Sequence, residues 1–207
     1  MGLAAANQVR LVQYRGFLDN WSHTRGSHSR GPSAAAHNVA CDHIVLPFQS
    51  FGLDATVEPF YWSGGGTYHN VVATKWGMVH PSRQYLIGGY YDSANAPGAD
   101  DDASGVALVL EAARVLSQYD AEYTIRFVAF DVKEQGLLGS QAYVAAHPAD
   151  NFLGMISADQ VADDPGTNLA LIQGSQLAET LKQGLSSALA LYGGLCGPLY
   201  RARGGGF

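Results

Sequence analysis

Acidic side chains recur in the middle of the chain, each of them placed at or just beyond the end of a short apolar run. They are Asp92, Asp131 with Glu134, and Asp159, and the loop between the first run and the next apolar segment adds Asp100, Asp101 and Asp102. Carboxylates gathered in one place repel one another unless a cation lies among them, and a divalent metal ion is the usual cation. Taken singly, each acid is equally well explained as a solvated loop residue or a helix cap, for which Asp102 is an obvious candidate. As a set, they predict a metal centre built from carboxylates.

The elements that must position these acids alternate between strands and helices. Apolar runs predict strands at residues 85–91, 124–130 and 152–158, while helical spacing of apolar residues predicts helices at 104–118 and 137–147. A strand-helix-strand alternation is typical of a parallel sheet with helices on its faces. Ligands of such sheets bind outside the carboxyl ends of the strands. The acids are therefore expected to converge on one edge of the sheet.

The flanking segments complete an α/β fold. A helix at 34–51 and strands at 55–62 and 68–76, joined by a glycine turn at 63–67, are expected to form one edge of the sheet. A further strand at 169–173 and a helix at 176–191 follow, whereas residues 201–207 show no helix or strand pattern and are expected to form a loop. The prediction is a mixed sheet with a parallel centre sandwiched between helices, in a single domain spanning residues 1–207.

Composition narrows the classes of function. The 207 residues are 47% hydrophobic and 14% charged, as in an ordinary globular domain. The net charge of -6 argues against a nucleic acid partner, which needs a basic face. We find neither an apolar run of about 18 residues, as a transmembrane helix requires, nor a signal peptide pattern at the N-terminus. Cys41 and Cys196 lie far apart in the sequence, and we expect them not to be bonded.

Three stretches carry a family resemblance. Residues 88–93 read GGYYDS, residues 96–105 read APGADDDASG, and residues 133–140 read KEQGLLGS. In order and spacing they resemble the di-zinc aminopeptidases of the bacterial leucyl aminopeptidase type, whose fold glutamate carboxypeptidase and transferrin receptor share. The resemblance covers roughly residues 22–159. It implies up to two zinc ions and a hydrolase that cleaves the N-terminal residue of a peptide with metal-activated water.

The resemblance also implies roles for individual residues. Asp101 matches the aspartate that bridges the two metals, Glu134 matches a ligand of one zinc, and Asp159 matches a ligand of the other. Asp92 matches an aspartate that orients a histidine ligand through a hydrogen bond. That histidine is replaced here by Tyr90, which has to lose its proton before it can bind a metal.

Two further departures from the family concern catalysis. Lys133 stands where the family has the glutamate that acts as general base, and an ammonium cannot take a proton from water. The family's last histidine ligand lies in a C-terminal segment that this chain does not reach, so we expect the domain to be incomplete at its C-terminus. These departures predict a weakened or inactive peptidase. A non-catalytic binding domain and a fragment of a longer peptidase remain as alternatives, and Lys133 is expected to pair with the neighbouring acids.

Overall fold

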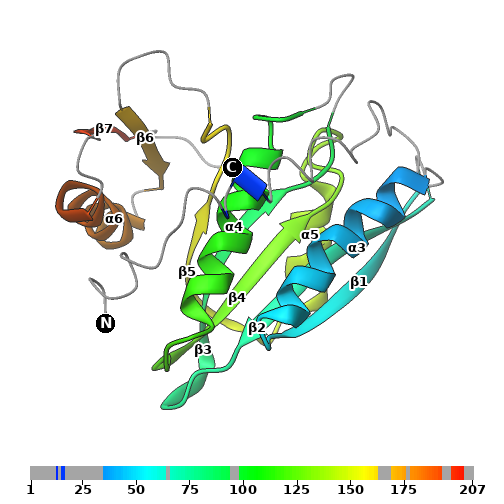
Figure 1. Cartoon of the computed structure of the whole chain (residues 1–207), viewed down its shortest axis with the longest axis horizontal. Helices are drawn as coiled ribbons and strands as arrows, with labels where there is room; N and C mark the ends of the chain where they lie inside the picture. The colour runs from blue at the N-terminus through cyan, green and yellow to red at the C-terminus, as the bar shows by residue number, and fades with distance from the viewer. Residues whose placement is uncertain are drawn as a thin grey trace.

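A five-stranded mixed sheet forms the centre of the protein in the computed structural model (Figure 1). The structure describes residues 13, 15–16, 35–63, 66–93, 98–162, 169–175, 178–192 and 197–202. In spatial order the strands are β1 (Asp54–Trp62), β2 (Gly66–Lys75), β4 (Tyr123–Phe130), β3 (His80–Tyr90) and β5 (Asn151–Ser157). β1, β2 and β4 pair antiparallel, while β3 pairs parallel with both β4 and β5. The predicted mixed sheet is confirmed, with the β1-β2 hairpin at one edge.

Helices cover both faces of this sheet, as predicted. α3 (Ala35–Ser50) and α4 (Ala103–Leu116) lie together on one face, and α5 (Leu138–Ala146) lies on the other (Figure 1). Successive strand residues point to opposite faces, so Phe127 packs in the core under α3 and α4 while its neighbour Val128 packs with Tyr143 of α5. None of the helices in the described ranges is long and apolar enough to span a membrane.

The start of α4 is fixed by Asp102. Its side-chain oxygen Oδ1 accepts a hydrogen bond from the backbone N–H of Gly105 at 3.0 Å, which satisfies one of the free N–H groups of the first turn. The expectation that Asp102 caps this helix is confirmed. The cap also holds the acidic loop against the first turn of α4.

The C-terminal part of the described chain forms a second, smaller sheet. β6 (Leu169–Gly174) pairs parallel with β7 (Gly197–Ala202), and α6 (Glu179–Tyr192) packs beside them. The expectation that residues 201–207 form a loop is wrong for residues 201 and 202, which belong to β7. The strand begins with Gly197 and Pro198, residue types that are depleted in strands, and the glycines at 204–206 favour a loop. Cys196 lies outside the described residues, and its bonding stays a prediction.

The register of the parallel strands determines which residues meet at the carboxyl edge. Tyr90 lies opposite Phe130 across the β3-β4 pair, and Gly88 lies opposite Ser157 across the β3-β5 pair. All three strands therefore end at nearly the same level. The loops that follow them start side by side, which places their side chains within reach of one another.

Candidate functional site

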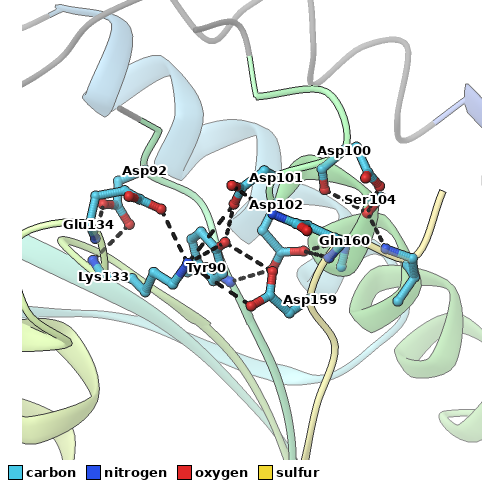
Figure 2. A network of polar contacts seen from close by, with 12 residues as sticks. Tyr90, Asp92, Asp100, Asp101, Asp102, Ser104, Lys133, Glu134, Asp159 and Gln160 are labelled. Atoms are coloured by element: carbon cyan, nitrogen blue, oxygen red, sulfur yellow. Dashed lines mark hydrogen bonds and ion pairs between the residues drawn. The ribbon is translucent and has the colours of Figure 1, made fainter. Parts of the chain in front are cut away.

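Polar side chains from four segments meet at the carboxyl edge of β3, β4 and β5 (Figure 2). The segments are the end of β3, the acidic loop before α4, the loop after β4 and the loop after β5. The residues that they contribute are Tyr90 and Asp92, Asp100 to Asp102, Lys133 and Glu134, and Asp159 and Gln160. Most of these residues are expected at this edge from the sequence.

The ammonium group of Lys133 lies among the acids of this edge. Its Nζ is 3.2 Å from Oε1 of Glu134 and 4.0 Å from carboxylate oxygens of both Asp101 and Asp159. It also donates a hydrogen bond of 2.6 Å to the hydroxyl of Tyr90 and lies 3.9 Å from the centre of that ring. The three carboxylates that the sequence singled out as metal ligands thus surround one lysine nitrogen, and the predicted pairing of Lys133 with the acids is confirmed.

Tyr90 places its hydroxyl between the acidic loop and the loop after β5. The hydroxyl donates to Oδ1 of Asp101 and lies 3.0 Å from Oδ1 of Asp159, so its single proton has two carboxylate acceptors. Burial raises the pKa of Tyr90 above its ordinary value, and the hydrogen bond to Asp101 and the negative charge of Asp159 raise it further. The phenol therefore keeps its proton.

Asp92 is buried and secures the loop that follows β4. Its two carboxylate oxygens accept the backbone N–H groups of Lys133 at 2.9 Å and of Glu134 at 3.0 Å. Burial raises the pKa of Asp92, although these backbone hydrogen bonds oppose the rise. Asp92 fixes the two adjacent residues at the point where their side chains enter the site. The role suggested by the resemblance, orienting a ligand at position 90, stays a prediction.

The loop after β5 is tied to the acidic loop by three consecutive backbone N–H groups. Those of residues 160, 161 and 162 donate to Oδ1 of Asp102, Oγ of Ser104 and Oδ1 of Asp100, at 3.2, 2.9 and 2.8 Å respectively. The side chain of Gln160 adds a bond of 2.9 Å from Nε2 to Oδ2 of Asp101. These contacts hold Asp159 beside Asp101.

Asp102 connects these hydrogen bonds between the two loops to β3. Its Oδ2 accepts the backbone N–H of Tyr90 at 3.0 Å. Burial raises the pKa of Asp102 to about 8, against the lowering effect of that hydrogen bond.

Sequence reasoning assigned Ser104 to the helix start only and missed Gln160 altogether. The position of Gln160 directly after Asp159 was the one signal that pointed to it.

The donor set of this site consists of oxygens. In the ranges that the structure describes, no three His, Cys, Asp or Glu side chains are grouped so as to hold a metal ion. Asp101, Glu134 and Asp159 come together around Lys133 instead. The roles of these three residues and of Tyr90 as metal ligands stay predictions.

Comparison with known proteins identifies the family. The model of peptidase family M28 matches residues 70–205. A probable zinc metalloprotease of Pyrenophora teres f. teres is 43% identical over 128 residues, which are 53% of this chain and 28% of that protein. Leucine aminopeptidase 1 of Ajellomyces capsulatus is 36% identical over 138 residues, 59% of this chain and 35% of that protein. The chain thus spans about a third of the length of these curated relatives.

A solved structure supports the same assignment at the level of the fold. The aminopeptidase from Aneurinibacillus sp. strain AM-1 superposes with a TM-score of 0.80 at 17% identity, covering 99% of this chain and 82% of that one. Zinc is the metal named for the curated metalloprotease relatives. The family model matches well over half of the chain, and the sheet, its helices and its acidic edge fit the match. The chain therefore belongs to peptidase family M28.

Proposed function

We propose that this chain is a metallo-exopeptidase-type domain that hydrolyses peptides weakly or not at all. The observation that carries the proposal is the position of the Lys133 ammonium, 2.6 Å from the Tyr90 hydroxyl and 3.2 Å from Glu134. By the family resemblance, this position holds the base that takes a proton from the attacking water. The substrate class of the relatives, peptides with a free N-terminus, is proposed for this chain as well.

A general base must have a free lone pair, and Lys133 has none while it is protonated. Burial lowers the pKa of Lys133, but the hydrogen bond to Glu134 and the charges of Asp159 and Asp101 outweigh it, so the pKa lies above its ordinary value. The lysine therefore remains an ammonium at neutral pH. Loss of a general base typically lowers the rate by about 10²–10⁴-fold.

The residues at this edge do not fit zinc. Zinc sites in proteins usually include nitrogen or sulfur ligands beside any carboxylates, whereas Asp101, Glu134 and Asp159 offer oxygen alone. Tyr90 keeps its proton and so offers no phenolate. A positive charge already lies within 4.0 Å of each of the three acids and would repel a divalent ion placed among them. We therefore derive no catalytic step through a metal in this chain.

An aminopeptidase assay tests the proposal. Wild-type protein with leucine p-nitroanilide and added zinc is expected to give no zinc-dependent release of nitroaniline above the protein-free rate. Lys133→Gln removes the charge and Lys133→Glu restores an acid, and each is assayed alone and together with Tyr90→His. Turnover by the wild type that requires zinc and disappears in Asp101→Asn would show that the base and ligands have been misassigned.

Binding without hydrolysis is a second candidate function. Two of the acids remain accessible, because the side chain of Asp101 is 45% exposed and that of Asp159 is 51% exposed. Three carboxylates face the single positive charge of Lys133, so two negative charges remain, and the half-exposed carboxylates can receive the monovalent ammonium of a peptide N-terminus. Calorimetry with one peptide in free and N-acetylated forms tests this function. Tighter binding of the free form that is lost in Asp159→Asn supports it, and equal affinities reject it.

A further inference from the structure

Lys133 reaches acids from three separate segments with one nitrogen atom. Glu134 neighbours it in the loop after β4, Asp101 comes from the loop before α4, and Asp159 follows β5. The side chain extends from the loop after β4 toward Tyr90, and its Nζ lies 3.9 Å from the centre of that ring, next to the acids (Figure 2). A single cation therefore connects the three loops of the carboxyl edge.

The backbone beneath this lysine is held independently of its side chain. Asp92 accepts the N–H groups of residues 133 and 134, and the N–H of residue 137 donates to the carbonyl of Lys133 at 3.0 Å. The side chain thus extends from a fixed base over a fixed ring. A lysine that turned outward into solvent would give up the 2.6 Å hydrogen bond to Tyr90 and the contacts with all three acids.

Carboxylates held this close need a cation to remain ionised together. In metal-binding members of such a fold, divalent ions supply that charge. Here the ammonium supplies it, with three donors that suit several carboxylates at once. The misfit of this site to zinc, described above, and the position of Lys133 thus have one physical explanation.

We propose that the Lys133 ammonium is the resident cation of this acidic edge, so that the three loops stay assembled without any metal. This inference deepens the proposed function and rests on it, because both depend on the position of Lys133 Nζ among the three acids. It has a direct consequence. Removal of the ammonium leaves a cluster of carboxylates that a free cation, either a metal ion or a small alkylammonium, can enter and stabilise.

Thermal unfolding of the full chain tests this inference, with EDTA, zinc chloride, ethylammonium chloride or sodium chloride at matched ionic strength. Wild-type protein is expected to melt within about 1 °C of the same temperature in all four conditions. Lys133→Ala is expected to melt lower in EDTA, by about 2–8 °C if the lost contacts resemble exposed ion pairs. Zinc or ethylammonium should recover several degrees of that loss, and sodium should recover less.

Lys75→Ala is the matched control. Lys75 donates to the backbone carbonyl of Ser117 at 3.3 Å and is not paired with a carboxylate of the described structure, so its removal should create no response to zinc. The control also subtracts zinc bound by histidines elsewhere in the chain. If Lys133→Ala does not fold, Lys133→Met, which keeps a long unbranched side chain without the charge, is tested in the same way.

Each outcome separates this inference from the proposed function. If zinc raises the melting temperature of the wild type more than that of Asp101→Asn, and the wild type hydrolyses no peptide, a metal binds at this edge. That result overturns the inference that Lys133 is the resident cation but leaves the proposed function standing. If the wild type hydrolyses peptides while zinc leaves its melting temperature unchanged, the proposed function is overturned and the inference stands. If Lys133→Ala has the melting temperature of the wild type and no added cation changes it, the lysine does not stabilise this edge, which also overturns the inference.

Discussion

The hydroxyl of Tyr91 joins elements that are far apart in the sequence, and its removal is predicted to destabilise the fold. It lies 2.9 Å from Oδ2 of buried Asp131, 2.6 Å from the carbonyl oxygen of His69 and 3.2 Å from the thiol of Cys41 on α3. Tyr91→Phe deletes this oxygen and leaves the ring in place. A hydrogen bond to a charged group contributes about 1.5–3 kcal/mol, and the buried partners would lose it without access to water.

The expected loss for Tyr91→Phe is therefore about 2–3 kcal/mol of unfolding free energy, or about 4–12 °C in melting temperature for a chain of this length. Urea denaturation followed by tryptophan fluorescence measures it. Tyr61→Phe is the control, because Tyr61 is 76% exposed and should change stability by less than about 0.5 kcal/mol. A Tyr91→Phe protein as stable as this control would refute the reasoning.

Three further outcomes are predicted from packing and burial. Gly105→Ala places a methyl group against the carboxylate of Asp102 and should lower the free energy of unfolding by about 1–3 kcal/mol, measured by urea denaturation. Gly184→Ala on α6 meets open space and should raise the free energy of unfolding by about 0.5–1 kcal/mol. Similar values for the two variants would contradict the packing seen at Gly105. Burial raises the pKa of the Cys41 thiol to about 11, which leaves little reactive thiolate at pH 8. In a Cys196→Ser variant, iodoacetamide should therefore alkylate Cys41 about 100-fold more slowly in the native protein than in urea. Equal rates would show that the thiol is accessible.

The elements of the sheet and the edge that bears the acids could be predicted from the sequence. Apolar spacing marks β3, α4 and β4 because each buries a regular face, and parallel strands must end at one edge. These elements and their common edge depend on local patterns or on the period of the strand. The pairing of Lys133 with the acids was predicted from the family resemblance, which places residue 133 beside a metal ligand, together with the charge and length of its side chain.

The hydrogen bonds between the loop after β5 and the acidic loop before α4 could not be predicted in the same way. The N–H groups of residues 160 to 162 find their acceptors on Asp102, Ser104 and Asp100, more than fifty residues earlier. Backbone donors leave no trace in the residue types, so such contacts appear only when the loops are placed in space. β7 was missed for a different reason, because it begins with Gly197 and Pro198, residue types that are depleted in strands.

Direct titration of zinc into the wild-type protein and into Asp101→Asn, by calorimetry at neutral pH, tests the central claim that Lys133 takes the place of the metal. If the ammonium is the resident cation, the two isotherms should coincide, because any zinc bound then goes to side chains elsewhere in the chain. A site that binds zinc with one-to-one stoichiometry in the wild type and vanishes in Asp101→Asn would contradict the claim.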